Sequence, residues 1–201
     1  MKAPELQDAI LISRAQGGDH RAFESLVRRH QRQVYSLALR MLNHPQDAED
    51  VLQETFLALY NNLEKFKQRS SLATYLYRLA TNFSLMKLRR RKSRGYQHQV
   101  RLEEAAEHPD PKAYGLDRIL DTELRKLLNR FLIELDEKER AAVVLADIEG
   151  LPGAQAAKIL GLTLPAFKSR LHRGRDNLRR KLLPYMESGI KNKPDLSRDV
   201  H

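Results

Sequence analysis

Apolar residues recur at steps of three and four along most of the chain, and this period constrains the fold more than any other feature. The pattern begins after Asp19, which can cap a helix, and continues to a break at Asn43-His44-Pro45. Similar stripes run from about Ala48 to Leu63 and from about Ser71 to Arg91. No stretch alternates convincingly at a period of two, so the sequence predicts an all-α fold.

A change of composition divides the chain into two helical blocks. Residues 95–117 contain glycine, proline and several glutamates without a sustained apolar period, and we interpret them as a flexible linker. The predicted limits are residues 1–94 for a first small helical domain, 118–186 for a second, and 187–201 for a polar tail that we expect to be disordered.

Charge and composition narrow the possible functions. Lys and Arg total 36 against 26 Asp and Glu, and the formal net charge of +10 favours a polyanionic partner through counterion release. The chain has no cysteine, its seven histidines lack ligand spacing, and no apolar run approaches the ~20 residues of a membrane span. We therefore predict no metal, no cofactor, no membrane insertion and a cytoplasmic location.

The sequence also lacks the common catalytic motifs. It contains no GxxxxGK[ST] phosphate loop, no GxSxG elbow and no HExxH pair. We therefore predict that the protein is not an enzyme.

The stretch from Gly153 to Leu182 predicts a helix-turn-helix. A capping box at Asp136 and Glu139 opens the preceding helix, which closes at Gly150. Ala157 is small where two helices must touch, and Gly161 tolerates the positive φ that the turn requires. Residues suited to the shared core follow this spacing: Ala156, Leu160, Leu162, Phe167 and Leu171.

The second helix of this motif carries polar and cationic residues on the side that faces away from its core. Side chains of these types contact base edges and phosphates in duplex DNA. The candidate duplex-binding residues are Lys168, Ser169, Arg170, His172, Arg173 and Arg175. A plain helical hairpin with a solvated basic face is the alternative.

An acidic face is predicted on the second helix of the first block. Asp47, Asp50 and Glu54 follow an i, i+3, i+7 spacing, and Gln53 lies beside them. This face is either solvated, with favourable charge near a helix N-terminus, or a docking surface for a basic helix of another protein.

The third helix of the first block interleaves aromatic and cationic residues. Unpaired bases stack on aromatic rings while cations follow the backbone, so this pattern is typical of single-stranded nucleic-acid binding. Phe83 falls on the apolar stripe and is assigned to packing. The candidate strand-binding residues are Tyr75, Tyr77, Arg78, Asn82, Lys87, Arg89, Arg90 and Arg91. A helix that is merely basic is the alternative.

Taken in order, these motifs resemble a bacterial sigma factor of the extracytoplasmic-function (ECF) class, in the sigma-70 superfamily. The resemblance covers about residues 17–183 and depends on GDHRAFESLVRRHQRQVYSLALRML, DAEDVLQETFLALY, SSLATYLYRLATNFSLMKLRRRK and KSRLHRGRDNLRRKL. It implies that the acidic face binds the clamp helices of the core RNA polymerase β′ subunit. It further implies that the third helix captures the −10 promoter element as single strand, and that the helix-turn-helix reads the −35 element as duplex.

The resemblance implies further partners, which are promoter DNA, the polymerase β flap and an anti-sigma factor.

The chain also departs from the family pattern at some positions. The chain has Pro152-Gly153-Ala154-Gln155 where members commonly have Ser-Tyr-Glu-Glu, and Pro165-Ala166-Phe167 where Gly-Thr-Val is usual. Tyr75 stands where tryptophan is usual.

Two other functions are compatible with parts of the pattern. A self-sufficient helix-turn-helix regulator would use the first block for dimerisation or effector binding. An RNA-binding helical enzyme or adaptor is the third possibility. The acidic face beside an aromatic and basic helix counts against the self-sufficient regulator, and no catalytic motif supports the third possibility.

Overall fold

The structure is a computed structural model that describes residues 3–68, 70–93 and 122–187. Within these ranges it consists of helices and connecting loops without a strand, which confirms the all-α prediction. The predicted linker at residues 95–117 and residues 188–201 of the predicted tail lie outside the described residues.

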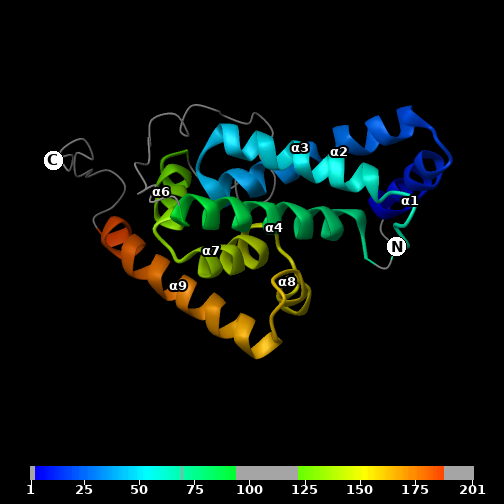
Figure 1. Cartoon of the computed structure of the whole chain (residues 1–201). Coiled ribbons are helices and arrows are strands. Elements are labelled where there is room, and N and C mark those ends of the chain that lie inside the picture. The colour runs from blue at the N-terminus through cyan, green and yellow to red at the C-terminus, as the bar shows by residue number, and fades with distance from the viewer. Residues whose placement is uncertain (1–2, 69, 94–121, 188–201) are drawn as a thin grey trace.

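Helices of the N-terminal half pack side by side around a buried apolar core (Figure 1). They are α1 (Ala3–Gln16), α2 (His20–Leu42), α3 (Pro45–Asn61) and α4 (Leu72–Ser93). The sequence pattern did not predict α1, which packs on α2 and buries Ile12.

Local capping explains where these helices begin and end. The Asp19 carboxylate accepts a hydrogen bond from the Ala22 amide at 3.1 Å, as its N-cap position requires. Asn43 ends α2 with a φ of 47°, and its amide donates to the Leu39 carbonyl at 2.7 Å. Pro45 follows as the first residue of α3, where a missing amide hydrogen is tolerated. The predicted break is therefore confirmed.

The C-terminal half contains the predicted helix-turn-helix. Its elements are α6 (Thr122–Ile133), α7 (Glu137–Val143), the π-helical turn η2 (Val144–Ile148), α8 (Gly153–Ile159) and α9 (Leu164–Glu187). Gly161 has a φ of 64° in the turn between α8 and α9, and Phe167 packs without exposure in the core behind it.

The predicted capping box forms in a different way. The Asp136 carboxylate caps α7 by accepting from the Lys138 amide at 3.0 Å. Glu139 points to α9 instead, where it accepts a hydrogen bond from Asn177 at 3.1 Å. The long-range hydrogen bond of Glu139 to Asn177 therefore replaces the local bond to the N-cap amide that a capping box requires.

The two halves pack against each other in the described structure. Helices α2 and α4 contact α6, α7 and α8, and buried side chains from both halves belong to one apolar cluster. In Figure 1, α7 lies between α4 and α9, while α9 runs along the outer side of the molecule.

Gly174 should be essential for the packing of α9 on α7. A Cβ atom there would lie 2.8 Å from Val143 Cγ2 and 3.2 Å from the Glu139 carbonyl oxygen. Gly174→Ala should lower the free energy of unfolding by about 1–3 kcal/mol, as overpacking does, in urea denaturation. Gly153→Ala is the matched control, because its Cβ would meet Phe167 at an ordinary 3.5 Å. Equal stability of the two variants would contradict the prediction.

Candidate nucleic-acid interface

Part of the predicted acidic face is paired within the N-terminal half. Lys87 Nζ of α4 lies 2.8 Å from Asp50 Oδ2 and 3.5 Å from Asp47 Oδ1 of α3. Arg91 forms an ion pair with the other oxygen of Asp47. Two residues predicted to bind polymerase are thus joined to two residues predicted to bind DNA.

These contacts shift the pKa values of the paired groups. The hydrogen bond from Lys87 holds the pKa of the Asp50 carboxyl below its ordinary value. Partial burial opposes charge on Lys87, but the hydrogen bond to Asp50 and the charge of Asp47 outweigh it and raise the pKa of Lys87. Each group therefore favours the charged state of its partner.

The open part of the α3 surface is partly apolar. Gln53 is exposed and Glu54 half-buried, and Leu57 and Tyr60 are 61% and 48% exposed. Leu57 and Tyr60 lie four and seven residues after Gln53, so they continue the same face of the helix. Neither residue was predicted for this face from the sequence, although their offsets of four and seven residues from Gln53 were an available signal.

Tyr75 and Arg78 present a flat, cationic surface near the start of α4. The Arg78 guanidinium lies 5.1 Å from the centroid of the Tyr75 ring, whose other neighbour is Phe66 at 4.9 Å between centroids. Further residues predicted to bind the single strand are exposed along the same helix: Asn82, Arg89 and Arg90. Lys87 and Arg91 are half-buried.

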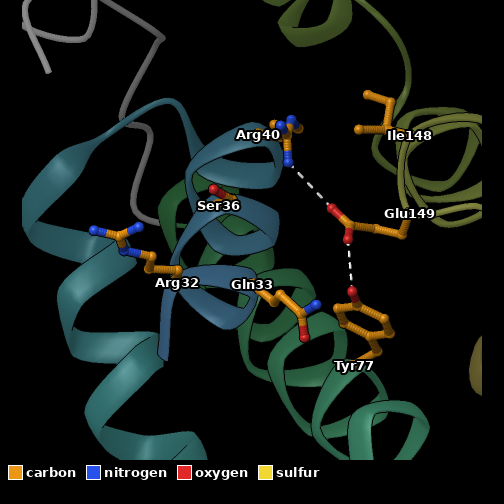
Figure 2. Close-up of a pocket in the computed structure, with 7 residues that line it drawn as sticks. All are labelled: Arg32, Gln33, Ser36, Arg40, Tyr77, Ile148 and Glu149. Carbon is orange, nitrogen blue, oxygen red and sulfur yellow. Dashed lines mark hydrogen bonds and ion pairs between the residues drawn. The ribbon is translucent and has the colours of Figure 1, made fainter. Parts of the chain in front are cut away.

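Tyr77 lies on a different side of α4 and is 6% exposed. Figure 2 shows its hydroxyl directed at Glu149 of the C-terminal half, to which it donates at 2.7 Å. Burial, together with the charge of Glu149, raises the pKa of Tyr77 far above its ordinary value, so the phenol stays neutral. Tyr77 is therefore not available to a nucleic-acid base in this arrangement, contrary to the predicted surface.

The predicted duplex-binding side of α9 faces solvent. Lys168, Ser169, His172 and Arg173 are exposed, while Arg170 is half-buried. Two of the predicted duplex-binding cations have carboxylate neighbours: Arg175 donates to Asp147 at 2.5 and 3.0 Å, and Arg173 Nε lies 3.5 Å from Glu139.

The described residues offer neither a metal site nor a membrane span. In residues 3–68, 70–93 and 122–187, no three or more His, Cys, Asp or Glu side chains gather closely enough to hold an ion. None of the helices in these ranges is long and apolar enough to cross a membrane.

The Asp50–Lys87 pair should contribute a pH-dependent part of the stability. The pKa of Asp50 is lower in the folded protein, so its contribution is complete above about pH 4 and is lost as the pH falls through the folded-state pKa. Asp50→Asn should lower the free energy of unfolding at pH 7 by less than about 1 kcal/mol, since the pair is partly exposed.

Urea denaturation between pH 7 and pH 2.5 measures this difference. The difference between wild type and Asp50→Asn should shrink toward low pH. Glu49→Gln, which changes an exposed carboxylate of the same helix, controls for the loss of one negative charge. A difference that stays constant with pH would show that the ion pair is not its source.

Comparisons with known proteins agree with this geometry. Residues 26–94 match the model of Sigma-70 region 2, and residues 125–178 match that of Sigma-70, region 4. The chain is 31% identical over 176 residues to ECF RNA polymerase sigma factor SigW of Bacillus subtilis, covering 85% of this chain and 94% of that protein. It is 34% identical over 190 residues to ECF RNA polymerase sigma factor SigM of Mycobacterium tuberculosis, covering 92% and 89%.

Solved structures share the fold. CnrH, solved in complex with the cytosolic domain of CnrY, matches with a TM-score of 0.65 and 28% identity over 89% of this chain and 99% of that chain. The sigma factor RpoE from Bartonella quintana, at 22% identity, matches with a TM-score of 0.62 over 80% and 96%. Both region models match in chain order and the relatives align over most of their length, so the chain belongs to the ECF sigma factors of the sigma-70 family, which are transcription initiation factors.

Proposed function

We propose that this sigma factor binds core RNA polymerase through α3, holds the melted −10 element along α4 and reads the −35 element as duplex with α9. One observation carries the proposal: a single chain presents an acidic and apolar helix face, an aromatic and cationic helix, and an exposed helix-turn-helix face. A self-sufficient DNA-binding regulator requires the last of these surfaces alone.

The proposed docking surface on α3 combines charge with apolar area. Glu54 supplies charge for a basic partner helix, and the exposed Leu57 and Tyr60 supply apolar contact area beside it. Asp47 and Asp50 belong to the same face, although α4 already holds part of their charge. The clamp helices of the β′ subunit are the proposed partner, and the β flap is the proposed partner of the C-terminal half.

The proposed −10 surface runs along α4. Tyr75 can stack on an unpaired base, and Arg78 beside it can add a cation. Exposed Asn82, Arg89 and Arg90 lie farther along the helix, where they can follow the strand. Lys87 and Arg91 can join them by exchanging a carboxylate for a phosphate, since both now pair with α3.

The proposed −35 surface separates base contacts from phosphate contacts. Lys168, Ser169, His172 and Arg173 near the start of α9 are candidates for the major groove. Arg179, farther along α9, is exposed and suited to phosphates, whereas Arg180 beside it pairs with Asp176.

We also propose regulation by an anti-sigma factor, and action in the cytoplasm, where core polymerase is found. The support is by similarity: RpoE of the same fold was solved in complex with the anti-sigma factor NepR, and CnrH in complex with the cytosolic domain of CnrY. The residue limits 1–94 and 118–186 are our proposal for the polymerase-docking and −35-reading parts of the chain.

Charge reversal on the open part of α3 should prevent transcription. Glu54→Arg places a cation where a basic helix docks, so affinity for core polymerase should fall at least about tenfold, the lower range for charge complementarity at interfaces. Binding to labelled core and run-off transcription on candidate promoters measure the loss. Glu24→Arg makes the same charge change at an exposed residue of α2, outside the proposed docking surface, and should behave as wild type. Asp50→Arg is avoided, because it would also repel Lys87.

Two classes of α9 residue should differ in DNA binding. His172→Ala should change the relative affinities of −35 sequences by about 1–3 kcal/mol, as loss of a base contact does. Arg179→Ala should weaken all sequences alike and reduce the salt slope by about one. Competition binding of duplexes with randomised −35 elements at several salt concentrations separates the two outcomes. Identical behaviour of the variants would contradict the division of roles.

A further inference from the structure

We propose that Glu149 is a latch that holds the two halves of the free protein closed and must release before both promoter elements are bound. The latch itself depends on the described contacts alone. Its role in promoter recognition additionally depends on the function proposed above.

Glu149 joins the halves through both of its carboxylate oxygens. Arg40 Nη1 of α2 donates to Oε1 at 3.1 Å, and the Tyr77 hydroxyl of α4 donates to Oε2 at 2.7 Å (Figure 2). The Glu149 and Arg40 side chains are each 10% exposed. A carboxylate this buried needs such partners, because burial of an unpaired charge is strongly unfavourable.

Other contacts continue the interface on either side of the latch. Arg140 of α7 donates to the Met41 carbonyl at the end of α2 at 2.5 Å, and to the Ile133 carbonyl of its own half at 2.6 Å. Gln155 of α8 donates to the Thr74 hydroxyl of α4 at 2.5 Å. These bonds place polar groups of α7 and α8 on the N-terminal half.

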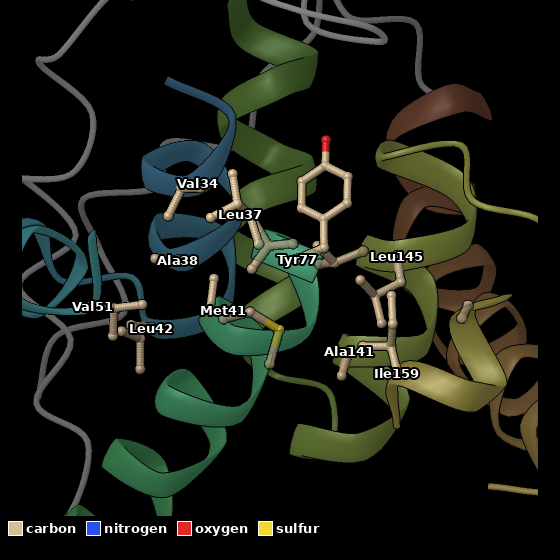
Figure 3. Close-up of a cluster of buried hydrophobic side chains, with 14 of the residues drawn as sticks. Val34, Leu37, Ala38, Met41, Leu42, Val51, Tyr77, Ala141, Leu145 and Ile159 are labelled. Carbon is tan, nitrogen blue, oxygen red and sulfur yellow. The ribbon is translucent and has the colours of Figure 1, made fainter. Parts of the chain in front are cut away.

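An apolar layer lies between these polar contacts. Figure 3 shows Tyr77 and Met41 of the N-terminal half beside Leu145, Ala141 and Ile159 of the C-terminal half. All five are buried. The closed arrangement is therefore a packed interface with a buried ion pair in it, and not a loose encounter of two domains.

The closed arrangement is too small to bind both promoter elements. The promoter elements take their names from positions −35 and −10, which are about 25 base pairs apart, or about 85 Å at 3.4 Å per base pair. A compact body of 201 residues is about 43 Å across by the usual size scaling. The halves must therefore separate, and separation breaks the contacts of Glu149.

The closed form covers one side of α4 and leaves the proposed docking surface on α3 open. Tyr77 and Thr74 on α4 are covered by Glu149 and Gln155, whereas Gln53 and Leu57 on α3 remain exposed. Polymerase can therefore dock on the closed protein through α3 before the halves part. This order would keep the strand-binding helix partly covered until polymerase is present.

The chain is well suited to a direct test, because it contains no cysteine. Gln31→Cys on α2 and Lys158→Cys on α8 place two labels on exposed positions of different halves. Distances between the labels are measured in the full chain without polymerase. The background is either wild type, Glu149→Lys, Glu149→Gln or Tyr77→Phe, with Asp147→Asn as control, since its ion pair with Arg175 lies within the C-terminal half.

We expect one short distance in wild type and in Asp147→Asn. Glu149→Lys places a cation against Arg40, so the ratio of open to closed protein should rise roughly 5- to 150-fold, the usual range for coupling between sites. Glu149→Gln and Tyr77→Phe, which keep the shape of the interface, should give smaller increases. Affinity for random-sequence single-stranded DNA should rise with the open fraction, while affinity for −35 duplexes should not change.

Two results would overturn the latch. One is a broad or long distance in wild type, and the other is an unchanged short distance in Glu149→Lys with the helical circular dichroism of wild type. If Glu149→Lys does not fold, the Glu149→Gln and Tyr77→Phe distances decide in the same way. Failure of the wild type in run-off transcription would instead count against the proposed function, because the distances are measured without polymerase.

Discussion

The apolar side of α2 is packed from two directions, and the arrangement of the other elements follows from this. Helices α1, α3 and α4 cover it within the N-terminal half, while α6, α7 and η2 reach it from the C-terminal half. Each half is a small helical unit with its own buried residues, and a small domain buries too little surface to be very stable. Because both halves pack on the apolar side of α2, the buried core is larger, while α3 and α9 keep their outer faces in solvent.

Ion pairs decide how much of the net charge of +10 is available to DNA. Lys87 and Arg91 pair with α3, and Arg175 pairs with Asp147, so binding of a phosphate to any of them requires release of a carboxylate. Such an exchange gains less binding free energy than the neutralisation of a phosphate by a cation that was only hydrated before. Exposed cations such as Arg89 and Lys168 should therefore dominate the salt dependence, and the number of basic residues alone overstates it.

The sequence predicts what is local and misses what is long-range. Asp19, Asn43 and Gly161 act on backbone groups within a few residues, so the helix ends and the turn of the helix-turn-helix could be predicted from them. Tyr77 was predicted for the DNA surface from composition, but its partner Glu149 lies 72 residues away and has no periodic signal. Helix α1 was missed, because its apolar residues include the exposed Leu6 and Ile10 and so blur the amphipathic pattern.

A buried ion pair is a suitable device for an interface that must open. Replacing it by apolar residues of similar volume is often neutral or stabilising, so Glu149 and Arg40 are not needed to make the closed form as stable as possible. The pair instead penalises misaligned closure, because a displaced Glu149 would lose its hydrogen bonds from Arg40 and Tyr77 inside the interface. In the separated halves water solvates both groups, so opening exchanges one satisfied state for another. The binding free energy of a docked partner then has to compensate for the apolar contacts that are lost on opening and for a small electrostatic difference. It does not have to compensate for a buried charge without a partner.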